Sequence, residues 1–209
     1  MRLRTTMTWL TLLCVAMLVS CGRDDTMGPG DGTALFPRTT PEELIRCFAH
    51  AMEERDMDSF AECHDEAYLF EFTLQDAELI GLPVGEPWWG RTEDLAAMDN
   101  LFESGQVSGI ECDLHVSSGP WPDGDLVRYR LEPNIKITVE DGSWSERMTY
   151  WVFSSWFDVE IGSDPEESEK WVLLRIKESL KDPSGSGAES LTAAGTEPST
   201  FGGIKSMFK

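Results

Sequence analysis

The clearest periodic pattern in the chain is an amphipathic helix followed by the start of a second one, over residues 39–60. Thr40 suits the N-cap and Pro41 the first helical position, and Glu43 completes a capping box with Thr40. A polar run through Asp56 ends this helix, and a short helix is expected after it. One apolar stripe at helical spacing predicts the buried face: Leu44, Ile45, Phe48, Ala49 and Met52.

The remaining chain alternates apolar and polar residues and predicts strands. Before residue 105 we expect a strand at 68–72 and helices at 74–80 and 92–104, with Thr92 as the N-cap of the last. Four later strands are expected at 110–117, 127–139, 148–161 and 171–176. Pro133 indicates a bulge or an edge, and Asp141-Gly142 a hairpin turn. This order predicts an α+β fold, with one antiparallel sheet and its helices on one face.

The N-terminus has the features of an export signal. Arg2 and Arg4 precede the apolar run Met7–Val19, which is shorter than the ~20 residues that span a bilayer. The run ends in LVSCG, which resembles a bacterial lipoprotein lipobox. The resemblance implies a signal peptide at 1–20 and lipidation of Cys21. The alternative is an ordinary secretory signal in which this cysteine is incidental.

Composition divides the chain after the signal into three parts. Residues 21–38 are rich in Gly, Asp, Thr and Pro and predict a flexible tether, whose coil would span roughly 20–25 Å. Residues 39–181 carry the periodic patterns and have the length of one domain. Residues 182–209 turn to Ser, Gly, Thr and Ala, and we expect a disordered tail.

The chain is strongly acidic, with 17 Lys and Arg against 38 Asp and Glu and a formal net charge of −21. This charge excludes nucleic acid as a partner, because nucleic-acid binding needs a cationic surface. It also keeps the domain away from anionic lipid surfaces. The sequence contains no nucleophile elbow, phosphate loop or metalloprotease motif, and we expect no cofactor and no metal.

Two cysteines flank the Asp56 turn at similar distances along the chain. An antiparallel helical hairpin would bring Cys47 and Cys63 together. In an oxidising compartment we predict a disulfide between them, contributing about 3 kcal/mol in the chain-entropy model, with Cys112 free. Two alternatives stay open: three buried free thiols, or a zinc site of Cys47, His50, Cys63 and His64. Adjacent residues such as the last two point apart, which weighs against zinc.

Several stretches, in this order, resemble the NTF2-like or SnoaL-like superfamily of cone-shaped α+β domains: TPEELIRCFAHAMEERDMDSFAECHDEAYLFEF, PWWGRTEDLAAMDNLF, MTYWVFSSWFDVE and EKWVLLRIKE. The resemblance covers about residues 39–181. It implies a curved antiparallel sheet with the N-terminal helices packed on one face and a pocket between them. The superfamily contains isomerases, dehydratases, hydrolases and cyclases as well as non-catalytic binding and dimerisation modules.

Five residues are candidates for ligand binding. Trp88 and Trp89 stand in a loop framed by Gly and Pro and would rim a pocket, where Arg91 would pair with an anion. His50 beside the apolar stripe and Tyr68 on the first strand complete the set. The structural alternative is that one Trp packs under the loop, that Arg91 helps to begin the helix, and that His50 is a packed residue.

These patterns predict a lipoprotein tethered to the membrane at the periplasmic face of the cell envelope. Gly22, in place of the Asp of a retention signal, favours the outer membrane by analogy. We expect a non-catalytic module that binds a small apolar ligand or another protein. Residues 150–157 are apolar on both faces, which indicates a homodimer through the sheet or a central strand covered by its own tail. The alternative is a small-molecule lyase, isomerase or hydrolase with an acid–base residue in the pocket.

Overall fold

The computed structural model describes residues 36–140, 147–152, 155–181, 196–198 and 200–209. The signal peptide, Cys21, most of the tether and the Asp141-Gly142 turn lie outside this part of the chain, so these predictions stay predictions. Among the described residues, no helix combines the length and apolarity that a membrane crossing requires.

The helices α2 and α3 form where the periodic pattern predicts them. The structure places helices at α2 (Pro41–Glu54), α3 (Met57–Glu62), α4 (Leu74–Leu79), α5 (Arg91–Glu103) and α6 (Phe201–Ser206). Thr40 Oγ accepts a hydrogen bond from the Glu43 backbone N–H, as an N-cap does. The Glu43 carboxylate reaches Thr39 instead of the Thr40 N–H, so the predicted capping box is only half formed.

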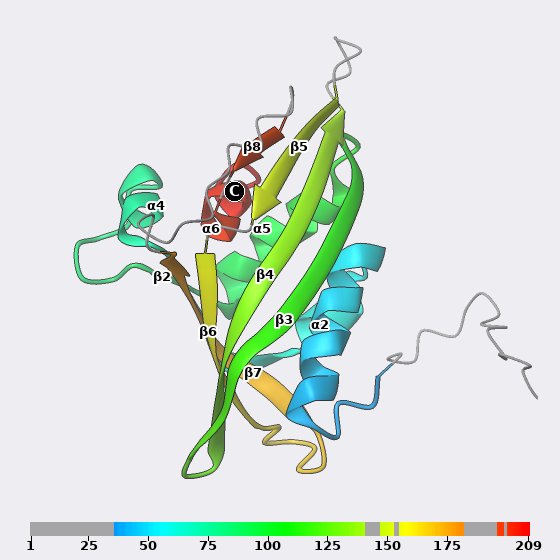
Figure 1. The fold of residues 1–209 in the computed structure, drawn as a ribbon, viewed down its shortest axis with the longest axis vertical. Helices are drawn as coiled ribbons and strands as arrows, with labels where there is room; N and C mark the ends of the chain where they lie inside the picture. The colour runs from blue at the N-terminus through cyan, green and yellow to red at the C-terminus, as the bar shows by residue number, and fades with distance from the viewer. Residues whose placement is uncertain (1–35, 141–146, 153–154, 182–195, 199) are drawn as a thin grey trace, which may run out of the picture. The chain divides into compact units, whose positions relative to one another are not determined.

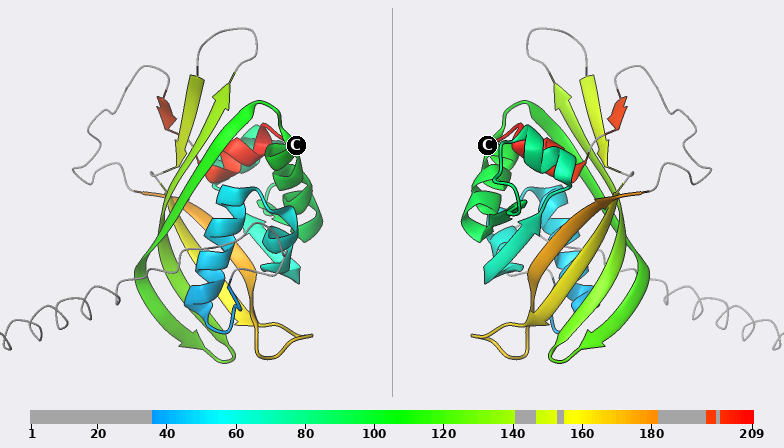
Figure 2. Two further views of the ribbon diagram at one scale, coloured as in Figure 1. Left: turned by 90° about the vertical axis from the view of Figure 1, so that its right-hand side faces the viewer. Right: turned by 90° about the vertical axis from the view of Figure 1, so that its left-hand side faces the viewer.

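The strands form one curved sheet in the order β2-β1-β7-β6-β4-β5-β8, and β3 pairs with the other edge of β4. Among the strand pairs of the described residues, β1–β7 and β5–β8 are parallel and the others are antiparallel. Figures 1 and 2 show the curvature, with α2, α5 and α6 on the concave side. This arrangement confirms the predicted α+β class. The strands are β1 (His64–Glu71), β2 (Trp88–Gly90), β3 (Val107–Asp123), β4 (Leu126–Glu140), β5 (Arg147–Val152), β6 (Ser155–Ser163), β7 (Trp171–Leu180) and β8 (Thr196–Pro198).

The single strand predicted at 148–161 is wrong, because the structure has two strands there. Both β5 and β6 lie along the same edge of β4, β6 beside residues 127–131 and β5 beside residues 135–140. Pro133 falls between these two partners while its other side pairs with Leu114 in continuous register. A residue without a backbone N–H therefore stands where β4 changes neighbours, and no bulge forms at it.

The start of α5 differs from the prediction in a way that sheet pairing explains. Residues 88–90, expected as loop, pair with β1 as the edge strand β2. The strand continues to Gly90, which takes the N-cap position that the sequence assigned to Thr92. The helix consequently begins at Arg91, directly at the end of the strand.

The prediction of a disordered tail from residue 182 is wrong for residues 200–209. Thr200 caps α6 by accepting a hydrogen bond from the Gly203 N–H, and Phe201 and Ile204 are fully buried. Two glycines in so short a helix oppose helix formation by roughly 1 kcal/mol each relative to alanine. Packing against the core therefore holds α6, and the domain boundary set at residue 181 omits part of that core.

The outer face of the sheet is charged. Cross-strand ion pairs run over β4, β6, β7 and β1, where rows of opposite charge face each other: Arg128–Glu160, Arg130–Asp158, Arg175–Glu71 and Lys177–Glu71. Each exposed pair contributes little to stability. A homodimer through this part of the sheet would have to desolvate the charges, and it stays a prediction that the structure does not test.

The first testable prediction concerns the C-terminal helix. Phe201→Ala should lower the free energy of unfolding by about 3–5 kcal/mol, because it removes a fully buried ring and leaves a cavity. The exposed Met207, in the turn that follows α6, provides the control, and Met207→Ala should change stability by no more than about 0.5 kcal/mol. Urea unfolding followed by tryptophan fluorescence gives both values. Equal, small effects would mean that α6 does not pack on the domain.

Candidate functional site

A charged pair lies in the interior of the domain. The Nζ of Lys205 on α6 is 2.5 Å from Oδ1 of Asp94 in the first turn of α5, and both side chains are 0% exposed. The same ammonium group lies over two aromatic rings, 3.8 Å from the centre of Phe70 and 4.4 Å from that of Phe201. Burial raises the pKa of Asp94 and lowers that of Lys205, and each partner opposes the shift of the other.

His64, the first residue of β1, lies near this pair with its ring in the aromatic core. Its Nδ1 is 2.7 Å from the Phe60 carbonyl oxygen, so the proton resides on Nδ1 and Nε2 keeps a free lone pair. This Nε2 is buried and has no hydrogen-bond partner among the described residues. Burial, aided by the charges of Lys205 and Arg91 and opposed by the hydrogen bond to Phe60, lowers the pKa of His64 to about 3, so the ring is neutral at physiological pH.

Tyr68 follows His64 on the same face of β1, and the two ring centres are 4.2 Å apart. The Tyr68 hydroxyl is buried and likewise has no partner among the described residues. Burial raises its pKa well above the ordinary value, and the negative charge of Asp94 adds to this effect. In the same cluster, Asp94 Oδ2 is also buried and has no hydrogen-bond partner among the described residues. The interior therefore holds more polar atoms than its hydrogen bonds satisfy.

A second buried carboxylate fastens the start of α6. Glu178 on β7 accepts hydrogen bonds from the backbone N–H groups of Phe201 and Gly202, both at 2.8 Å. A Cβ at Gly202 would lie 2.6 Å from the Phe72 ring, so glycine is required for this approach. Burial raises the pKa of Glu178, and the two N–H groups oppose that rise. The helix is thus held at both ends by buried acids.

Among the described residues, the apolar cavity between α2 and the sheet is too small for a ligand. A cavity there measures only about 10 Å³, which is about the least that holds one water molecule. It is lined entirely by apolar side chains: Ile45, Phe48, Leu114, Leu131, Phe157, Val159, Leu173 and Ile176. The pocket that the sequence resemblance implies is therefore filled at this place by the protein's own side chains.

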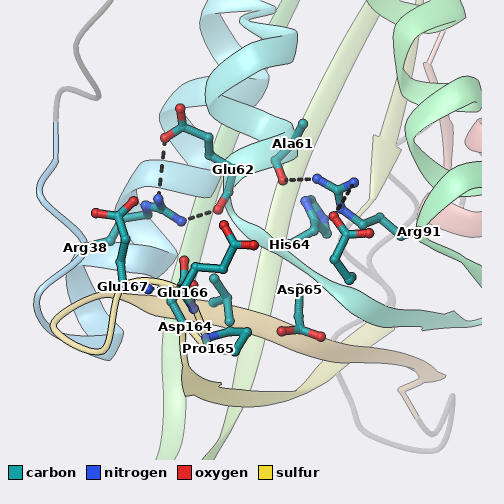
Figure 3. A pocket seen from close by; sticks show the side chains of 12 residues that line it. Arg38, Ala61, Glu62, His64, Asp65, Arg91, Asp164, Pro165, Glu166 and Glu167 are labelled. Atoms are coloured by element: carbon teal, nitrogen blue, oxygen red, sulfur yellow. Dashed lines mark hydrogen bonds and ion pairs between the residues drawn. The ribbon is translucent and has the colours of Figure 1, made fainter.

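A surface pocket of about 260 Å³ lies on the other side of His64, where α3, α5 and the β6–β7 turn meet (Figure 3). Two arginines line it and bond to the C-terminal end of α3, Arg38 to the Glu62 carbonyl and Arg91 to the Ala61 carbonyl at 3.2 Å. These contacts satisfy carbonyls that a helix end leaves unpaired. Its rim is acidic: Glu62, Asp65, Glu66, Asp164, Glu166 and Glu167. Within the described part of the chain, no three side chains of metal-binding type group closely enough to hold an ion.

The predicted loop site does not come together. Trp89 is buried against Phe72, with ring centres 4.7 Å apart, whereas Trp88 is exposed. Arg91 begins α5 and lines the pocket of Figure 3, which neither tryptophan lines. Arg91 acts on the buried cluster through its charge, which lowers the pKa of His64.

The other predicted residues fall in two places. Tyr68 belongs to the interior cluster, whereas His50 lies at the far side of α2, beside a surface pocket of about 260 Å³ and the Phe36 ring at 5.9 Å. Cys47 and Cys63 are buried neighbours, as the helical hairpin predicts, and their thiols share a hydrogen bond. Both are free thiols in the structure, so the disulfide stays a prediction.

Sequence reasoning missed Asp94, Lys205 and Glu178, and it did not connect His64 with Tyr68. Asp94 and Lys205 are 111 residues apart, and charged residues are ordinarily exposed, so nothing local marks this pair. A weak signal existed for α6, because Phe201 and Ile204 stand three residues apart behind the capping residue Thr200.

No protein-family model and no curated protein sequence matches the chain. Solved structures do match. A candidate aromatic ring hydroxylase from Novosphingobium aromaticivorans gives a TM-score of 0.51 at 17% identity, over 70% of this chain and 90% of that one. The Kfla4162 protein of Kribbella flavida gives 0.50 at 15% identity, over 68% and 88%. A candidate dehydratase from the NTF2-like family of Streptomyces avermitilis gives 0.39 at 20% identity, over 66% and 90%. At such identities the likeness shows the fold alone, and it agrees with the fold that the sequence resemblance implies.

The buried pair generates a prediction for stability. Lys205→Met should cost about 3–5 kcal/mol of unfolding free energy, because it leaves the Asp94 charge buried and unpaired. The double variant Asp94→Leu/Lys205→Met should return to within about 1 kcal/mol of the wild type, since an apolar pair of similar volume needs no desolvation. Denaturant unfolding of the four proteins gives the coupling energy. Additive losses in the double variant would contradict a direct interaction.

His64 predicts a pH dependence. Its folded pKa lies below the unfolded value of about 6.5, so the unfolded state binds the proton first and stability falls as the pH drops from 6.5 towards 3. Relative to a His64→Asn variant, the wild type should lose about 2.5 kcal/mol between pH 7.5 and pH 4.5. The exposed His115 is the control, and His115→Asn should leave the pH dependence of the wild type unchanged. Parallel stability curves for wild type and His64→Asn would show that the ring titrates freely.

Proposed function

We propose that this chain, whose fold is that of the NTF2-like superfamily, is a lipid-anchored protein of the cell envelope and that its domain binds a partner without catalysing a reaction. The observation that carries the proposal is the sealed interior. The buried carboxylate Asp94 is paired with Lys205 of α6, and neither side chain is exposed.

Catalysis by a general acid or base requires the group to reach the substrate within hydrogen-bond distance. Asp94 and Lys205 are 0% exposed, Tyr68 is 1% exposed and His64 is 4% exposed. With α6 in place, Asp94, Lys205 and Tyr68 are covered, and of the four residues only His64 lines a surface pocket among those described. The surface pockets beside His64 and beside His50 carry charged residues, and so does a third pocket of about 280 Å³ on the sheet. Charged rims suit the recognition of a partner.

The anchor is proposed from the sequence. The LVSCG motif resembles a lipobox, and acylation of Cys21 would attach the N-terminus, each buried CH₂ contributing about 0.8 kcal/mol. The tether would then hold the acidic domain near a membrane without embedding it. The absence of an Asp after Cys21 favours the outer membrane, with the domain on the periplasmic face.

The alternative function is a small-molecule lyase, isomerase or hydrolase, and one observation favours it. His64 Nε2, the Tyr68 hydroxyl and Asp94 Oδ2 are buried without partners among the described residues, and such groups are costly unless something uses them. This activity would require α6 to leave. The activities named for the similar structures cannot be assigned to this chain, because a shared fold at 17% identity does not imply a shared mechanism.

A complementation experiment tests the proposal. In the source organism, a strain without this protein would be grown under envelope stress from detergent and chelator, and variants would be expressed from a plasmid. Tyr68→Phe, which removes only the hydroxyl, should restore growth as the wild type does. Cys21→Ala should fail, and it should not incorporate a clickable fatty acid that labels the wild type.

Two outcomes would contradict the proposal. If the folded Tyr68→Phe protein fails to restore growth, the hydroxyl has a chemical role and the enzyme alternative gains. If Cys21→Ala is labelled as strongly as the wild type, Cys21 is not the site of acylation. Circular dichroism of the purified domain provides the folding control for each variant.

A further inference from the structure

The ammonium group of Lys205 has the contacts that a protein would make to a small ammonium ligand. Its charge meets a carboxylate, Asp94 Oδ1 at 2.5 Å, and two aromatic faces, Phe70 at 3.8 Å and Phe201 at 4.4 Å. Carboxylates and aromatic faces are the groups with which proteins recognise alkylammonium ions in places without water. The terminal helix brings this ammonium to groups on β1 and α5, which lie more than 100 residues earlier.

The interior near Lys205 offers more hydrogen bonding than this side chain uses. Asp94 Oδ2, the Tyr68 hydroxyl and His64 Nε2 are buried and have no described partners. Leaving such a group unpaired is unfavourable, and an apolar pair is often as stable as a buried ion pair. Stability alone therefore does not explain why this interior keeps a charged pair whose charges act on an unpaired phenol and an unpaired imidazole.

The segment that fills the site is a short helix. α6 has six residues, two of them glycine, so it has little helical stability of its own and is held by its contacts with the core. Short elements of this kind are the ones that open locally. If α6 undocked, Asp94 and the Phe70 face would lose their contacts with Lys205, and one cation would leave the site.

We propose that Asp94 and Phe70 form a binding site for a small primary alkylamine, which competes with Lys205 and α6 for the same place. This inference rests on the proposed function, that the domain binds rather than catalyses, and it names the class of ligand. The lysine side chain beyond Cα is a butylammonium group, which sets the size of amine that fits. The net negative charge of the chain favours the approach of a cation.

The experiment uses the full chain with Lys205→Ala and n-butylamine as the probe. In this variant, butylamine at pH 7.5 should raise Tm in a saturable manner, because it restores the missing ammonium beside Asp94. n-Butanol, which has the same alkyl chain without the charge, should have at least tenfold lower affinity. Lys205→Met is the matched control, since its side chain fills the space and should abolish the response. Asp94→Asn/Lys205→Ala should weaken butylamine binding by at least tenfold.

Competition is measured on the wild type, which avoids any folding defect of the variants. Saturating butylamine should increase amide hydrogen exchange in residues 200–209 and leave exchange in α2 unchanged. Equal responses of Lys205→Ala to butanol and butylamine, or none to either, would overturn the ammonium site. Binding by Lys205→Ala with unchanged exchange in the wild type would overturn the competition and make Lys205 a permanent structural residue.

The results separate this inference from the proposed function. If amine binding fails while Tyr68→Phe still restores growth, the domain is a binding module for another ligand. If amine binding holds while folded Tyr68→Phe fails to restore growth, the amine is a substrate and the non-catalytic proposal is wrong.

Discussion

The ion pair between Asp94 and Lys205 is the interaction on which the filled interior depends. A strongly curved sheet has a concave face that α2 and α5 cover only in part, and α6 supplies apolar side chains that complete this cover. The helix is short and contains two glycines, so it has no stability of its own. Its place is fixed by Lys205 near one end and by Glu178 at the other. Access to Asp94 and to the Phe70 ring depends on whether this helix stays.

The parts of the fold that depend on local sequence could be predicted. The stripe from Leu44 to Met52 forms the buried face of α2, and Thr40 caps it, because both signals involve neighbours along the chain. Alternation placed β3, β4 and β7 correctly, although each extends beyond the predicted range. The division of residues 148–161 into β5 and β6 was not predictable from alternation, since both segments alternate and only their pairing with different parts of β4 separates them.

The candidate site depends on contacts that are far apart in sequence, and here local reasoning had little to use. Two adjacent tryptophans in a turn-rich loop predicted a ligand site at Trp88 and Trp89. The pairing of β2 with β1 instead buries one ring and exposes the other. Asp94 resembled an ordinary acid in the first turn of a helix, where the dipole favours it. The glycine-rich composition of the tail predicted disorder. In the structure one of these glycines, Gly202, instead lets the α6 backbone approach the Phe72 ring.

Holding α6 by a buried ion pair costs desolvation free energy, because both charges leave water. The pair therefore needs an explanation besides stability. Apolar contacts alone would let a short helix dock in several registers, because Phe201, Ile204 and Phe208 are similar in chemistry and spacing. A charged group accepts only one position, since any shift leaves Lys205 or Asp94 buried without its partner. The pair therefore gives α6 one docked state and makes partial displacement unfavourable. With one docked state and an unfavourable intermediate position, α6 is either fully docked or fully undocked. A ligand can displace a helix that has only these two states.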